Sequence, residues 1–203
     1  MAPPPPAAPG ASAPQMNPLQ IQQQMSAARI AAKKVRRAAS VATADAWMLA
    51  IVAVPSLAAG LIDRGLIGIL LGAALCAIAC VEFSGAKRIR RLDPSSTRML
   101  GFNQLALAAV LIIYSLWSLH QAMNGGLAAE LKEHEAELQA MGKEMEDMLQ
   151  TTTNLVYYTL IAVAVFMQGG TALYYFSREK HIRQYVETTP PWIVEMQRNG
   201  APL

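Results

Sequence analysis

Four stretches of the chain are apolar along almost their whole length, and charged or helix-breaking residues separate them. They cover residues 46–62, 65–83, 99–119 and 155–176. A membrane-spanning helix needs about 17–25 predominantly apolar residues, and a backbone in lipid must satisfy its own hydrogen bonds. None of the four stretches alternates between apolar and polar positions as a barrel strand does. The pattern predicts an all-α, polytopic membrane protein with four transmembrane helices.

The composition favours a membrane protein over a soluble enzyme. Of 203 residues, 53% are hydrophobic and 15% are charged, whereas soluble domains carry about 25% charged residues. The first span is the least regular, because Asp45 directly precedes it and Pro55 within it predicts a kink. Aromatic residues near the proposed ends fit the membrane–water interface: Trp47, Trp117, Tyr157, Tyr174 and Tyr175.

Basic residues predict the orientation of the spans. Fourteen of the 17 Lys and Arg residues lie before the first span, between the second and third, or after the fourth. Because such residues accumulate on the cytoplasmic side, we expect both termini to be cytoplasmic. The alanine-rich composition suggests that the membrane is the plasma (inner) membrane of a bacterium. The same residues either serve orientation alone or also bind anionic lipid. The candidate lipid contacts are Arg29, Lys33, Arg36, Arg37, Lys87, Arg88, Arg90 and Arg91.

Three segments lie outside the transmembrane domain of residues 46–176. Residues 1–18 hold seven prolines and predict a disordered Pro/Ala-rich tail, and residues 19–45 predict a basic juxtamembrane helix. Residues 177–203 form a cytoplasmic C-terminal tail. Its apolar patch at 192–196 docks on lipid, on the protein itself or on a partner. No groove-reading motif accompanies the basic residues, so nucleic acid is not an expected partner.

An acidic segment separates the third and fourth spans. Residues 127–150 are rich in helix formers and hold seven acidic residues against two lysines, which predicts an extracytoplasmic helix joined to the fourth span by residues 151–153. The helix either breaks into a hairpin near Gly142 or lies along the membrane surface. A heptad seam faces its own hairpin partner, lipid or a second protein; its candidate contacts are Leu127, Leu131, Leu138, Met141 and Met145.

Small residues recur at every fourth position of the second span, at Gly68, Gly72, Cys76 and Cys80. Such a row lies on one helix face and lets a second helix approach closely. The stripe is therefore either an oligomer interface or a packing surface within the chain. A redox enzyme using the two cysteines is a weaker hypothesis, because a disulfide within one helical turn would be strained. We interpret both cysteines as small hydrophobic residues.

Residues that carry chemistry are scarce. Glu82 is the only acidic residue inside a span, and we expect it to reach the headgroups or to pair with Lys87 or Arg88; a proton carrier is the alternative. No motif indicates a catalytic site, a metal or another cofactor. The leading hypothesis is a non-enzymatic interaction, assembly or regulatory subunit that contacts lipid and either its own copies or other membrane proteins.

The alternative hypothesis is a small oligomeric channel or transporter. Its path would use the polar residues at membrane depth, which are Glu82, Asn103, Gln104 and Gln168. Polar side chains are costly in hydrocarbon, so they often mark such a path. Solute or ion flux would distinguish this alternative from an interaction subunit.

Overall fold

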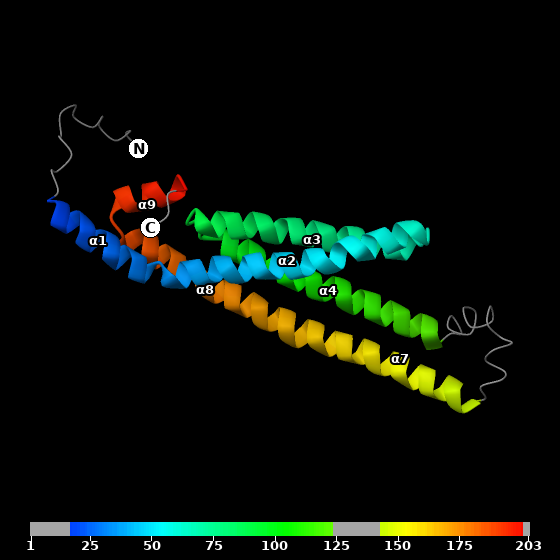
Figure 1. The fold of residues 1–203 in the computed structure, drawn as a ribbon. Coiled ribbons are helices and arrows are strands. Elements are labelled where there is room, and N and C mark those ends of the chain that lie inside the picture. Colours follow the sequence, from blue (N-terminus) through cyan, green and yellow to red (C-terminus); the bar gives the residue numbers. More distant parts are fainter. Residues whose placement is uncertain (1–16, 124–142, 201–203) are drawn as a thin grey trace, which may run out of the picture.

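The computed structural model describes residues 17–123 and 143–200, and these ranges are helical with short turns (Figure 1). The helices are α1 (Pro18–Ala31), α2 (Lys33–Ile62), α3 (Leu66–Arg90), α4 (Ser95–Met123), α7 (Lys143–Val163), η1 (Ala164–Gln168), α8 (Gly169–Thr188) and α9 (Pro191–Arg198). Four helical segments are long and apolar enough to cross a membrane: Lys33–Ile62, Leu66–Arg90, Ser95–Gln121 and Gln150–Thr188. The described residues confirm the predicted all-helical class and four helices that are long and apolar enough to span a membrane.

The fourth span is part of one long rod. α7, the π-helix η1 and α8 follow one another without a break. The expected link at residues 151–153 is therefore wrong, because these residues lie inside α7. The physical reason is that no glycine or proline occurs between Lys143 and Val163, so nothing in the sequence ends the helix there.

The first span begins earlier than expected. α2 starts at Lys33 and includes Asp45, which we had placed outside the span. Alanine is the best helix former, and Ala38, Ala42 and Ala46 are fully buried along one face of α2. This alanine face extends the packed part of the helix by two turns and brings Asp45 among its neighbours. The helix continues through Pro55.

The bundle is tight at one end and open at the other. α1 and α9 lie at the same end, which we call the α1–α9 end (Figure 1). From there the hairpin of α2 and α3 diverges from the pair formed by α4 and α7. α4 packs on α3 and on α8, and α8 also contacts α2. Helix packing is therefore concentrated where α2, α3, α4 and α8 meet.

Two groups of buried apolar residues hold the helices together. The larger lies towards the α1–α9 end and joins α2, α3, α4, α8 and α9 through residues that include Val35, Ile89, Leu100, Ile182 and Val194. The smaller joins α2, α3 and α4 through Ala53, Leu75, Ile78 and Leu107. Neither group includes a described residue of α7, and several apolar side chains of α7 are exposed, among them Leu155, Val156 and Tyr158.

The C-terminal apolar patch docks on the protein. α8 ends at Thr188, beside Pro190 and Pro191, and α9 then folds back. Ile193 is fully buried, and the indole Nε1 of Trp192 donates to Oε1 of Gln24 in α1 at 3.2 Å. α9 thereby fastens α1 to the end of α8.

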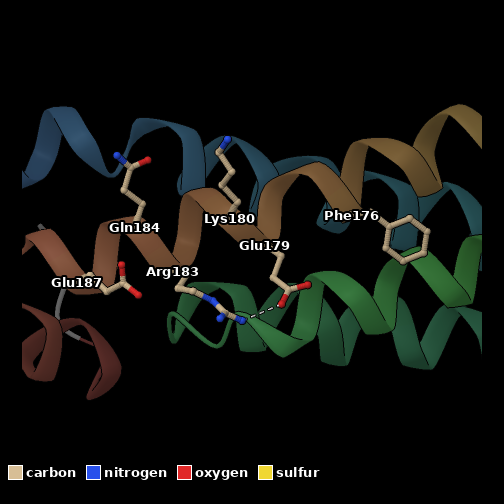
Figure 2. A pocket seen from close by; sticks show the side chains of 6 residues that line it. All are labelled: Phe176, Glu179, Lys180, Arg183, Gln184 and Glu187. Atoms are coloured by element: carbon tan, nitrogen blue, oxygen red, sulfur yellow. Dashed lines mark hydrogen bonds and ion pairs between the residues drawn. The ribbon is translucent and has the colours of Figure 1, made fainter.

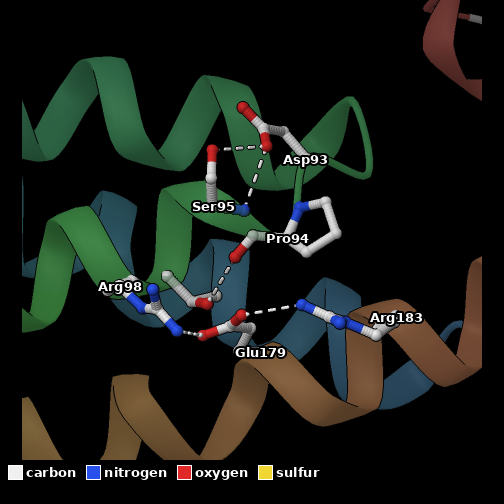
Figure 3. Close-up of polar contacts among 7 residues, drawn as sticks. Asp93, Pro94, Ser95, Arg98, Glu179 and Arg183 are labelled. Carbon is white, nitrogen blue, oxygen red and sulfur yellow. Dashed lines mark hydrogen bonds and ion pairs between the residues drawn. The ribbon is translucent and has the colours of Figure 1, made fainter.

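The turn between α3 and α4 carries an N-terminal cap. The backbone nitrogen of Ser95 donates to Oδ1 of Asp93 at 3.0 Å, and the Ser95 hydroxyl donates to the same atom at 2.7 Å (Figure 3). Pro94 lies between them, where its missing N–H costs no helical hydrogen bond. This cap begins α4 at the point that brings its next two turns against α3 and α8.

We expect Asp93→Ala to lower the free energy of unfolding by about 1 kcal/mol, because it leaves the backbone N–H of Ser95 without its acceptor. Asp93→Asn keeps a capping oxygen and serves as the control, with a much smaller loss. Reversible unfolding in mixed detergent micelles, followed by circular dichroism, measures both. Equal stability of the alanine variant and the wild type would contradict the capping role.

Candidate functional site

The most distinctive feature of the bundle is a group of polar side chains buried where four helices meet. We call Asp45, Glu82, Asn103, Gln104 and Tyr175 the polar cluster. They come from α2, α3, α4 and α8, with two neighbouring residues from α4. Glu82 and Tyr175 are fully buried, and Asn103 and Gln104 are nearly so. Buried polar groups at membrane depth are costly, which makes the cluster the leading candidate site.

Two amides from α4 hold the Glu82 carboxyl. Nε2 of Gln104 donates to its Oε1 at 2.7 Å, and Nδ2 of Asn103 donates to the same oxygen at 3.1 Å. The Asn103 amide also donates to the backbone oxygen of Ile78 at 3.0 Å. Since Ile78 lies one turn before Glu82, a single asparagine contacts both the backbone and the side chain of α3. These bonds fix the rotation of α3 against α4.

A second contact joins α2 to α8. The Tyr175 hydroxyl donates to Oδ2 of Asp45 at 3.1 Å. Asp45 is only partly buried, whereas Tyr175 is the largest fully buried side chain in the described part of the chain. Asp45 and Tyr175 both lie close enough to Glu82 to interact with it electrostatically. The cluster therefore extends from a buried carboxyl to a carboxyl with partial access to the surface.

The cluster has two buried oxygens without a hydrogen-bond donor. They are Oε2 of Glu82 and Oε1 of Gln104. No lysine or arginine forms an ion pair with Glu82 among the described residues; their two ion pairs both involve Glu179. A buried carboxyl without a cation is unusual, because burying an unpaired charge is strongly unfavourable. The arrangement is suited to proton binding.

The structure corrects two expectations about these residues. Glu82 neither reaches the headgroups nor pairs with Lys87 or Arg88, because its side chain turns inward onto α4. Tyr175 is not an interfacial ring but a core residue. Sequence reasoning missed Asp45 as well, since we began the first span one residue later. Gln168 lies in η1 and, in the described ranges, makes no hydrogen bond to the cluster.

The small-residue stripe divides between two surroundings. A Cβ atom built on Gly68 would lie 3.0 Å from Cα of Gly60, and one built on Gly72 would lie 2.6 Å from the backbone nitrogen of Leu57. Both glycines therefore face the backbone of α2 in the same chain. Cys76 is half-buried against the smaller apolar group, and Cys80 is exposed; both are free thiols.

The basic residues that we proposed as lipid contacts are exposed, and they extend from α1 and α2 to the end of α3. Beyond them, Oε2 and Oε1 of Glu179 in α8 contact Arg98 at 3.4 Å and Arg183 at 3.1 Å (Figure 3). Figure 2 shows the groove along α8 that holds this glutamate, lined by Phe176, Glu179, Lys180, Arg183, Gln184 and Glu187. Its mixed charges are typical of a solvated surface.

The acidic seam lies largely outside the described residues. This is the case for Leu127, Leu131, Leu138 and Met141, and for the side chain of Met145. No group of three or more His, Cys, Asp or Glu residues in the described ranges is arranged to hold a metal ion. No family model, no curated protein sequence and no solved structure matches the chain.

Proposed function

We propose that this chain is a non-enzymatic interaction, assembly or regulatory subunit of a bacterial plasma membrane. Its partner is a second copy of the chain or another membrane protein. The observation that carries this proposal is the outward face of α7, where Leu155, Val156 and Tyr158 are each more than half exposed. α7 packs chiefly on α4, and the hairpin of α2 and α3 diverges from it (Figure 1). A span with so little support from its own chain favours packing against further helices.

The proposed orientation places the α1–α9 end in the cytoplasm. Exposed basic residues at this end include Arg36, Arg37, Arg90 and Arg91. Positive charge accumulates on the cytoplasmic side of membrane proteins and attracts anionic lipid there. The packed ends of α1, α8 and α9 would then be available to a cytoplasmic regulator, while α7 serves contacts within the membrane.

Native mass spectrometry from mild detergent tests this proposal. We expect a complex larger than one 21.9 kDa chain. Replacing Leu155 and Val156 together by alanine should shift the population towards single chains. The matched control replaces Ile51 and Val52, whose side chains are similarly exposed on α2. A wild-type preparation that carries lipid but no second protein chain would contradict the proposal.

The polar cluster supports a second candidate, a small oligomeric channel or transporter. Its acidic and amide side chains are of the kind that mark a cation or proton path through a membrane protein, and they lie near one end of the bundle. Proteoliposomes that contain the purified chain and a pH- or ion-sensitive dye distinguish the two functions. Flux that depends on the chain favours transport, and its absence together with a stoichiometric partner favours the interaction subunit.

A further inference from the structure

The hydrogen bonds of the polar cluster leave two buried oxygens without a donor. Oε1 of Glu82 already accepts two amide hydrogens, whereas its Oε2 and Oε1 of Gln104 accept none. If Glu82 were ionised, both of these buried atoms would be acceptors and neither could satisfy the other. One proton on Oε2 turns that atom into a donor. Oε2 belongs to the carboxyl whose other oxygen already accepts from Nε2 of Gln104 at 2.7 Å. The unpartnered Oε1 belongs to that same Gln104 amide, so the new donor and the free acceptor lie on two side chains already in contact.

We propose that Glu82 is a proton-binding site: its carboxyl is a neutral acid in the packed bundle, and it exchanges its proton with the α1–α9 end through Asp45. The proposal concerns groups within one chain. It therefore goes beyond the partner proposed above and holds whether or not the protein transports a solute.

The groups that face Glu82 do not compensate a negative charge. α4 presents the neutral amides of Asn103 and Gln104, α2 presents Asp45 and α8 presents Tyr175. Arg90, on α3 itself, donates to the hydroxyl of Thr43 instead. An ionised Glu82 would thus have a second carboxyl as its charged neighbour, and like charges in a low-dielectric site repel strongly.

A proton fits the site better than a metal cation. A cation such as Ca²⁺ takes six to eight oxygen ligands, whereas Glu82 and Gln104 leave only two buried oxygens without a donor. The amide hydrogens of Asn103 and Gln104 point at the third, which a cation would have to displace. A proton needs only one oxygen and one acceptor, and both are present.

Asp45 provides the route for exchange. Along α3, Glu82 lies five residues, or about 8 Å, before Lys87 in the basic last turn of the helix. Asp45 is partly exposed and accepts a hydrogen bond from Tyr175, while Glu82, with which it interacts electrostatically, is fully buried. A proton from the α1–α9 side therefore meets Asp45 before it meets Glu82. Titration of Glu82 should be slowed, and not abolished, when Asp45 cannot carry a proton.

The experiment uses the full chain in lipid nanodiscs. Infrared titration should show the carbonyl stretch of a protonated carboxylic acid at neutral pH. The band should be lost in Glu82→Gln and retained in the control Glu179→Gln, whose carboxyl is ion-paired with Arg98 and Arg183. In the wild type, dicyclohexylcarbodiimide, which reacts with protonated carboxyls, should label Glu82 in peptide mass spectra. The labelling rate should fall roughly tenfold per pH unit above the midpoint, and Asp45→Asn should slow the recovery of labelling after a pH jump.

Several results would overturn the proposal. One is a wild-type protein without a protonated-carboxyl band at neutral pH. Another is protection of Glu82 from labelling by sodium at constant pH, which would indicate a metal cation instead. Exchange after the pH jump that is unchanged in Asp45→Asn would remove the assigned route. Since labelling and the jump are read in the wild type too, a failure of Glu82→Gln to fold leaves the test intact, and a missing partner does not affect it.

Discussion

Gly72→Leu should lower the free energy of unfolding by about 3 kcal/mol. Overpacking a well-packed contact typically costs about 1–3 kcal/mol, and this site is at the upper end because the obstacle is backbone. A Cβ atom on Gly72 would lie 2.6 Å from the backbone nitrogen of Leu57, and α2 can yield only by moving as a whole. The substitution should separate α2 from α3 along the stripe.

Gly170→Leu is the matched control for that substitution. Gly170 also lies within a span, and a Cβ atom there would meet nothing within 4 Å. We expect its free energy of unfolding to stay within about 0.5 kcal/mol of the wild type. Unfolding in mixed detergent micelles measures both variants. Equal losses at the two positions would mean that leucine perturbs any span glycine and that α2 and α3 are not in close contact at Gly72.

Tyr175→Ala should cost about 3–5 kcal/mol, the range for removing a large buried aromatic side chain. Tyr175 is fully buried in the larger apolar group, and its hydroxyl supplies the contact with Asp45. The loss should therefore separate α8 from α2 as well as create a cavity. The same micelle unfolding measures it, with near-ultraviolet circular dichroism as a probe of aromatic packing.

Two variants separate the causes of that loss. Tyr175→Phe keeps the ring and removes the hydroxyl, so it should cost only about 0.5–1.5 kcal/mol, the net value of one hydrogen bond. Phe166→Ala removes an exposed aromatic side chain of η1 and should have little effect. If Phe166→Ala destabilised the protein as much as Tyr175→Ala, the position of the core near the α1–α9 end would be wrong.

The spans were predictable because their signal is local. Length and apolar composition within about 20 residues decide whether a segment can be a membrane helix. The contact between Gly68 and Gly60 was also within reach of the sequence. The two glycines lie four residues on either side of Arg64 in a short turn, and residues equidistant from a tight turn meet in an antiparallel helix pair. Two small residues of the first span that are seven positions apart, Ala53 and Gly60, were the part of this pattern that we overlooked.

The polar cluster could not be predicted in the same way, because it depends on how far each helix is rotated about its axis. Asn103 and Gln104 face α3 only because α4 is turned towards it, and no local pattern fixes that angle. Tyr175 was misjudged for a related reason: an aromatic residue near the end of a span suits both the lipid interface and a core. The packing of α8 against α2 decides between them, and these helices are distant in sequence.

In the proposed topology, four helices cross the bilayer and leave the α1–α9 end in the cytoplasm. Labelling of single cysteines in sealed right-side-out vesicles tests it most directly, with Cys76 and Cys80 first replaced by alanine. Asp63→Cys lies in the exposed turn between α2 and α3, and Asn199→Cys follows α9. A membrane-impermeant maleimide should label Asp63→Cys at once and Asn199→Cys only after permeabilisation. Labelling of both from the same side would contradict the account.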